Sequence, residues 1–124
     1  MALCNCGSGR QFESCCKPFL VGKERPKTPE QLMRSRYTAY TLHDADYLIS
    51  TTHKSQHEYF SKPEILKWAT TNTWIKLEVL WAKEHQVAFK AYFLDENLQA
   101  QVHYEKSDFK NENGVWYYVD GEFN

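Results

Sequence analysis

The sequence has no cysteine after Cys16, no apolar run long enough to span a membrane, and no large excess of charge of either sign. It contains 15 Lys and Arg residues against 16 Asp and Glu residues, a formal net charge of −1. This balance argues against a protein whose main task is to coat nucleic acid. Residues 1–20 are interrupted by Arg10, Glu13 and Lys17. They therefore do not form a signal-peptide core, and we expect a cytoplasmic protein. A glycine-rich phosphate loop, a nucleophile elbow and internal repeats are also missing.

The apolar content is high enough to build a core. Of the 124 residues, 42% are hydrophobic and 15% aromatic, which excludes a disordered chain. A chain of this length favours one compact domain with a small appendage. We expect a metal knuckle over residues 1–20, a linker over 21–27 and an α+β domain over 28–124.

All four cysteines lie near the amino terminus, at Cys4, Cys6, Cys15 and Cys16. Four thiolates in so short a segment suit tetrahedral Zn²⁺, and a segment this small folds largely through metal binding. Disulfides are the alternative, but nothing marks the chain as secreted and a bridge between adjacent cysteines would be strained. A redox pair would have C-x-x-C spacing. We therefore predict one zinc ion bound by these four cysteines.

The middle of the chain has helical signals. Thr28 suits an N-cap and Pro29 the first helical position, so we expect a helix over residues 29–42. Asp44 is interpreted as the cap of a second helix that ends near Thr52, with Asp46 in its first turn. A short helix is expected over residues 63–70. The polar stretch between these last two helices carries no clear signal.

From Trp74 onward the hydrophobic period changes to two. Alternating patterns predict strands over residues 74–81, 87–93, 98–110 and 115–120, with a hairpin at 111–114. Helices followed by an antiparallel meander predict an α+β fold with the helices on one face of the sheet. We expect one core joining helices and sheet, made of Leu32, Tyr40, Leu48, Leu77, Val79, Phe89 and Phe93.

Several sequence stretches resemble the YchJ family of SEC-C motif proteins. They are the C-x-C…C-C knuckle, MRSRY at residues 33–37, DADYL at 44–48, E-x-S-x-F at 105–109 and WYY-x-DG at 116–121. The resemblance implies an NTF2-like, cystatin-like fold, in which helices lie across a curved antiparallel sheet around a cone-shaped cavity. SEC-C knuckles elsewhere contact proteins or ribosomes, so the resemblance implies a protein or ribonucleoprotein partner. It brings no settled biochemical activity.

The sequence departs from this family in two places. Many relatives carry a second cysteine knuckle at the carboxyl end, whereas this sequence reaches Asn124 without one. Relatives often have Trp-His-Pro where this sequence has Thr52, His53 and Lys54.

A row of polar residues on the third strand is the candidate pocket. His103, Glu105 and Ser107 occupy alternate positions and share one face of the sheet. If that face meets the helices, Glu105 pairs with Arg34 or Arg36, either as a structural link or as part of a ligand pocket. The remaining alternative is a row that faces solvent. The candidate pocket residues are Arg34, Arg36, Tyr40, His53, His103, Glu105 and Ser107.

Three functions follow as hypotheses. The first is a non-enzymatic zinc-knuckle adaptor that contacts a macromolecular partner and includes no catalytic residue. The second is a small-molecule-binding or catalytic domain, with the knuckle as a lid or stabiliser. The third is a nucleic-acid binder using the basic run from Lys17 to Lys27 and the aromatic residues at 116–118, although a solvated linker and core packing are the simpler interpretations. A homodimer through the outer face of the sheet is a further expectation.

Overall fold

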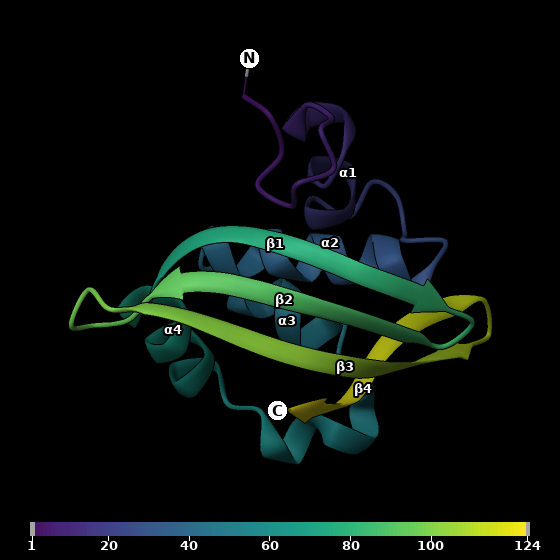
Figure 1. Cartoon of the computed structure of the whole chain (residues 1–124). Helices are drawn as coiled ribbons and strands as arrows, with labels where there is room; N and C mark the ends of the chain where they lie inside the picture. Colours follow the sequence, from purple (N-terminus) through teal and green to yellow (C-terminus); the bar gives the residue numbers. More distant parts are fainter. Residues whose placement is uncertain (1, 124) are drawn as a thin grey trace.

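The computed structural model describes residues 2–123 and consists of a curved antiparallel sheet with helices against one face (Figure 1). In Figure 1, α2 and α3 lie behind the sheet, and the N-terminal segment stands beside β1. The helices are η1 (Phe12–Ser14), α1 (Lys17–Leu20), α2 (Pro29–Thr41), α3 (Ala45–Ser50), η2 (Lys54–Tyr59) and α4 (Lys62–Thr71). The strands are β1 (Thr73–Lys83), β2 (Gln86–Leu94), β3 (Ala100–Glu112) and β4 (Val115–Phe123). The predicted α+β class, with helices packed on an antiparallel sheet, is confirmed.

Side-chain caps start the three longer helices that cover the sheet. The Thr28 hydroxyl accepts from the N–H of Gln31 at the start of α2, and Asp44 accepts from the N–H of Tyr47 at the start of α3. Ser61 does the same for α4. Each cap satisfies a backbone donor that the first turn leaves free. The expected helices 29–42, 44–52 and 63–70 are present, whereas α1 and η2 were missed because both are short and carry no apolar period.

The four strands run β1-β2-β3-β4, each antiparallel to the next. The β3–β4 hairpin turns at Asn113 and Gly114, which both have positive φ (55° and 85°), as a tight hairpin requires. β1 departs from simple alternation, because its pairing with β2 shifts register between Trp74 and Lys76 and again between Val79 and Trp81. Each shift changes which face the next residue takes. Strict alternation over residues 74–81 would place Ile75 on the same face as the core residue Leu77, but Ile75 is 56% exposed, and Trp74 packs against the core instead.

Among the described residues of the α+β domain, the apolar interior forms two clusters instead of the single core expected, and a third, smaller cluster holds the buried cysteines. The first lies between α2 and the sheet and includes Leu32, Leu77 and Phe89, with Val79 packed against it. The second lies among α2, α3 and α4 and consists of Ala39, Ala45, Leu48 and Ile65, with Tyr40 at its margin. Phe60 packs against both clusters. The helices bury one another's side chains behind the sheet, so Leu48 and Tyr40 belong to a helix–helix layer.

Other parts of the chain cover both edges of the sheet. At β4, the N–H of His53 donates to the carbonyl of Tyr118, and the N–H of Tyr118 donates to the carbonyl of Thr51, both at 2.8 Å. At β1, Gly7 lies so close to the carbonyl of Leu77 that a Cβ at Gly7 would be 3.2 Å from the oxygen. Among residues 2–123, every helix is too short or too polar to cross a bilayer.

Candidate functional site

Two tight turns bring the four cysteines together. Leu3 pairs with Gln11 in an isolated antiparallel bridge, and the N–H of Cys4 donates to the carbonyl of Arg10 at 2.8 Å. The chain reverses at Gly7 and Gly9, which have φ of 79° and 83°. Such angles strongly favour glycine, because a Cβ would be strained there. η1 and the start of α1 then return Cys15 and Cys16 to the first pair.

The arrangement of the sulfurs fits a metal ion. The four Sγ atoms all lie within 4.8 Å of one another, and the Sγ–Sγ distances are 3.6 Å for Cys6–Cys15 and 4.0 Å for Cys15–Cys16. A tetrahedral zinc with bonds of about 2.3 Å has sulfurs roughly 3.8 Å apart. All four cysteines are free, and Cys4, Cys6 and Cys16 are buried. These cysteines can therefore hold a metal ion.

Helix α2 contributes directly to the cysteine site. The Thr38 hydroxyl donates to Cys16 Sγ at 3.4 Å and lies 3.7 Å from Cys4 Sγ. The Arg34 guanidinium donates to the carbonyl of Cys6 at 2.7 Å. Donors around a thiolate site offset its negative charge and fix the ligands in place. The domain thus supplies part of the sulfur environment, a role for Thr38 that the sequence analysis missed.

Without a metal, the thiols share protons among themselves. A hydrogen bond from Cys16 lowers the pKa of Cys6 to about 4. Donation to Cys6, together with burial, raises the pKa of Cys16, and burial raises the pKa of Cys15. The lowered pKa favours Cys6 as the thiolate, and the raised pKa values favour Cys15 and Cys16 as thiols. A bound cation would displace those protons, because metal ligands bind as thiolates.

The polar row on β3 faces the helices, as one of the three alternatives predicted. Glu105 and Ser107 are buried and His103 is half-buried, whereas Val102 on the opposite face is exposed. Glu105 accepts from His103 Nε2 at 3.0 Å, from Ser107 Oγ at 2.5 Å and from Tyr118 Oη at 2.9 Å. Burial raises the pKa of Glu105, but these hydrogen bonds outweigh it, and its pKa lies below the ordinary value. The group is a buried carboxylate with donors on both oxygens.

The predicted ion pair between Glu105 and Arg34 or Arg36 is wrong. Tyr118 of β4 lies between Glu105 and Arg36, because its hydroxyl donates to the carboxylate while the Arg36 guanidinium sits 4.4 Å from the centre of its ring. Arg36 is instead satisfied by the carbonyl of Leu48 and the hydroxyls of Thr51 and Thr52. The alternating pattern of residues 116–118 indicates only core or stacking groups and gives no sign that Tyr118 is the link.

Arg34 and His53 lie apart from this cluster, whereas Tyr40 lies close enough to Arg36, Glu105 and Tyr118 to interact with them electrostatically. Arg34 belongs to the cysteine site and also pairs with Glu30 at 3.0 Å. His53 donates from Nε2 to Glu112 at 2.7 Å, while its Nδ1 accepts from the N–H of Ser55 and so caps η2. The ring of Tyr40 packs against Trp74. Of the seven candidates, the structure brings together His103, Glu105 and Ser107, with Arg36 joined to them through Tyr118.

Fold and site together define an NTF2-like α+β domain that carries an N-terminal cysteine knuckle. The chain belongs to the YchJ family: the family model for the YchJ middle NTF2-like domain matches residues 28–121. It is 42% identical to a UPF0225 protein of Actinobacillus succinogenes, over 96% of this chain and 80% of that protein. A UPF0225 protein of Serratia proteamaculans is 39% identical, over 96% of this chain and 82% of its own length.

Solved structures show the same architecture. A SEC-C motif containing protein from Rhodopseudomonas palustris, determined in solution, superposes with a TM-score of 0.89 at 36% identity and covers 96% of both chains. A crystal structure of a SEC-C motif containing protein from Psychrobacter arcticus gives a TM-score of 0.77 at 30% identity, over 94% of this chain and 80% of that one. The likeness covers the knuckle as well as the sheet, so the recognised motif and the observed cysteine group agree.

Proposed function

We propose that Cys4, Cys6, Cys15 and Cys16 bind one structural zinc ion. The donor set consists of sulfur alone, and the spacing of the sulfurs matches a closed tetrahedron. Zinc is the divalent ion that such sets commonly hold, and a site with four protein ligands leaves no position for substrate. Native mass spectrometry of the reduced protein tests this assignment, because it reports the mass and number of bound ions. A protein purified under reducing conditions that carries no zinc and takes none up would contradict it.

We also propose that the chain is a non-enzymatic adaptor, with the knuckle at residues 1–20 contacting a protein or ribonucleoprotein partner. The linker at 21–27 and the domain at 28–124 would support it. The observation that carries this proposal is the outward surface of the knuckle. Leu3 is 65% exposed and Val21 is 64% exposed at its base, while the sulfurs face inward. An apolar side chain on a rigid, metal-held turn is a suitable contact for a macromolecular surface.

The adaptor is tested by quantitative affinity capture from a lysate of the source organism. Leu3→Ser removes the exposed apolar contact and leaves the cysteines intact. Leu98→Asn is the matched control, because Leu98 is equally exposed but lies in the β2–β3 turn with positive φ, which asparagine tolerates. We expect a partner that both the wild type and Leu98→Asn retain. Leu3→Ser should fail to retain this partner, and zinc chelation should release it. A set of captured proteins that is the same for all four samples would contradict the adaptor.

The polar cluster around Glu105 supports a structural role more than a small-molecule site. Both carboxylate oxygens accept hydrogen bonds from the chain itself. Within the described residues, every fully buried side-chain nitrogen or oxygen has a hydrogen-bond partner. A ligand would have to displace these bonds, which are costly to lose in the interior. The alternative of a catalytic NTF2-like pocket at His103 and Glu105 is therefore the weaker proposal.

A further inference from the structure

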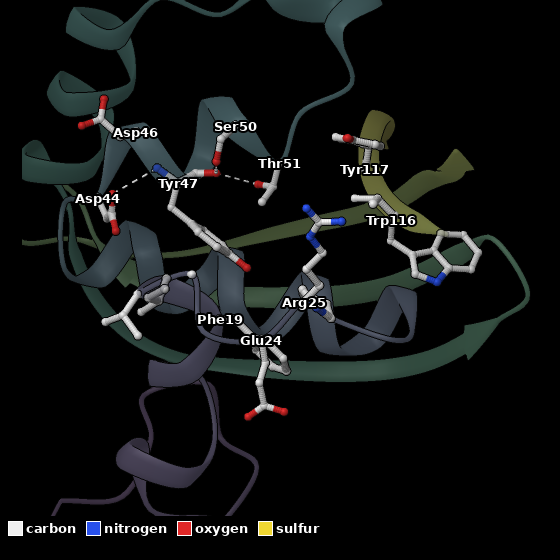
Figure 2. A pocket seen from close by; sticks show the side chains of 15 residues that line it. Phe19, Glu24, Arg25, Asp44, Asp46, Tyr47, Ser50, Thr51, Trp116 and Tyr117 are labelled. Atoms are coloured by element: carbon white, nitrogen blue, oxygen red, sulfur yellow. Dashed lines mark hydrogen bonds between the residues drawn. The ribbon is translucent and has the colours of Figure 1, made fainter. Parts of the chain in front are cut away.

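A groove lies between the linker and the start of β4, away from the cysteines. Its first part is a hollow of about 600 Å³ bounded by the end of α1, the linker, α3 and β4 (Figure 2). A second hollow of about 570 Å³ continues from it toward the β3–β4 hairpin and shares Glu24, Arg25, Pro26 and Trp116 with the first. We call the two hollows together the linker groove. Each is of the size that proteins use for ligands.

The linker groove is lined by both cations and carboxylates, and Arg25 is the cation that points into its first hollow. Within the part of the chain that the structure describes, the Arg25 guanidinium takes part in no hydrogen bond or ion pair. Figure 2 shows it pointing into the hollow between Thr51 and Trp116, whereas the Glu24 carboxylate points away. Asp44 is engaged as the cap of α3, and Asp46 pairs with Lys62 at 3.0 Å.

Lys27 adds a second cation to the linker groove, on the wall of the second hollow. It takes part in no ion pair within the described residues. With Arg25 it gives the groove two positive side chains, and the Glu24 carboxylate points away from the hollow, so an anionic group would meet Arg25 first.

Aromatic side chains line the same groove. Trp116 borders both hollows, and its indole N–H donates to the carbonyl of Lys27 at 3.2 Å, which fixes the ring against the linker. Tyr117 follows it on β4, and Tyr47 faces them from α3 (Figure 2). The sequence keeps the basic linker and the aromatic strand about ninety residues apart, and folding brings them together. Cations spaced along a groove with an aromatic wall are what a single strand of nucleotides requires.

We propose that the linker groove binds a short stretch of single-stranded nucleic acid. Arg25 and Lys27 would contact two phosphates, and a base would stack on Trp116. An acidic peptide would satisfy the cations but would leave the aromatic wall without a flat partner. The proposal goes beyond the adaptor function, since it concerns the linker and β4 and requires no contact of the knuckle. A contact with two phosphates also agrees with the overall charge of −1, which excludes only a protein that coats long nucleic acid.

Fluorescence anisotropy with the zinc-loaded full chain and short labelled single strands, one of RNA and one of DNA, tests the proposal. Two neutralised phosphates predict a slope of log K against log salt of about −1.4 for a single strand, measured between about 50 and 200 mM salt. Arg25→Gln should weaken binding and reduce that slope by about 0.7. Arg25 is exposed and has no partner within residues 2–123, so we expect this variant to fold as the wild type does. Lys67→Gln on α4, away from the groove, is the matched control and should bind as the wild type.

Trp116→Ala gives a second, independent result. Loss of a stacked base predicts binding weaker by roughly tenfold, with the salt slope unchanged. Trp116 also packs against the core, so circular dichroism must first show that the variant folds. Binding of either strand with this pattern supports the proposal, and a preference between them identifies RNA or DNA as the source. The proposal is overturned if neither strand binds or if Arg25→Gln binds as the wild type does. It is also overturned if duplex nucleic acid or polyglutamate displaces the labelled strand as well as an unlabelled single strand does.

Discussion

At the residue scale, the environment of Glu105 explains why a carboxylate is tolerated in the interior. Its side chain is 7% exposed and accepts from three different residues. Gly121 of β4 pairs with Ser107, and its backbone passes so close that any side chain there would collide with the carboxylate. Burial and the neighbouring carboxylate raise the pKa of Tyr118, which keeps its hydroxyl as a donor. The charge is thus enclosed by the sheet and by a phenol that stays protonated.

Glu105→Gln should destabilise the fold at neutral pH by about 1.5–3 kcal/mol, the usual worth of hydrogen bonds to a charged group. The amide nitrogen of glutamine is a donor and would face donors. Urea unfolding at pH 7 measures the loss. Glu122→Gln, an exposed residue on the neighbouring strand, is the control and should change little. If Glu105→Gln were as stable as the wild type, the charge of Glu105 would make no contribution to the free energy of unfolding.

The same residue predicts a pH dependence with a definite sign. The pKa of Glu105 in the folded protein lies below its ordinary value of 4.5, so the unfolded chain takes up the proton first. Its contribution to stability is fully present above that ordinary value and is lost as pH falls through the lower folded value. The stability difference between wild type and Glu105→Gln should therefore shrink on acidification below about pH 4.5. Urea unfolding of both proteins across pH 3–7, a range set by that pKa, measures it, and a constant difference would refute the assignment.

At the scale of elements, α2 has two faces with different tasks. Arg34, Thr38 and Thr41 lie at helical spacing and meet the knuckle, the last through a hydrogen bond from Asn5 at 2.9 Å. Leu32 and Tyr37 lie in the core cluster against the sheet. One helix therefore joins the cysteine site to the sheet, which makes the knuckle part of the domain's packing.

Thr38→Val should weaken zinc binding by about tenfold or more, because groups that hydrogen-bond to metal ligands commonly contribute that much. Valine keeps the shape of threonine but removes the donor to Cys16. Competition with a chromogenic chelator measures the affinity. Thr70→Val is a matched control, since Thr70 donates only within α4. If the affinities of the two variants are equal, the hydroxyl at 38 has no part in the metal site.

Phe89→Ala tests the packing of β2 against the helices. Phe89 is buried in the core cluster and pairs with Glu105 across the sheet. Its removal should cost about 3–5 kcal/mol through lost burial and the cavity that remains. Leu80→Ala on the exposed face of β1 is the control, with an expected change below about 1 kcal/mol. Denaturant midpoints compare the two, and similar losses would mean that the assignment of the two faces is reversed.

The elements that the sequence predicted well are those with local signals. Caps at Thr28 and Asp44, the alternation of β2 and the turn at Asn113 each depend on neighbouring residues, and all are present. The failures concern long-range choices. The register shifts of β1 arise from pairing with β2, and Arg36 found its partners at the end of α3, twelve or more residues away. The local sequence pattern predicts neither the register of β1 nor the partners of Arg36, because tertiary contacts determine both.

At the scale of the whole molecule, removal of zinc should affect two regions unequally. Chelation should disorder the first twenty residues while the sheet persists, because residues 28–121 contain both main core clusters and no cysteine. Hydrogen exchange followed by mass spectrometry would resolve this, with fast exchange confined to the knuckle and the adjoining turns of α2. Added zinc should restore protection. A single cooperative loss of protection throughout the sheet would instead show that the two parts fold as one unit.

For the candidate site, the sequence predicted the ligands but not their surroundings. Spacing alone identified the four cysteines, because thiolates so close in the chain must be close in space. The hydroxyl of Thr38 and the linker groove depend on which helix and which strand lie beside residues 1–27. A distance of twenty or more residues in sequence separates these partners, and only the packed structure brings them together.

The position of Gly7 against Leu77 has a consequence for how copies of this protein behave toward one another. An open β-strand margin can recruit a strand from a second molecule, and natural proteins usually shield such margins. Residues 51–53 shield β4 through two hydrogen bonds, whereas β1 is approached at Leu77 by the Gly7 turn, which the proposed zinc ion would hold in place. Loss of the proposed ion would therefore expose β1 as an open edge strand of an otherwise intact sheet. If the knuckle binds zinc as proposed, the native domain of a zinc-starved cell would become the template for intermolecular strand pairing, and the ion would protect solubility as well as local shape.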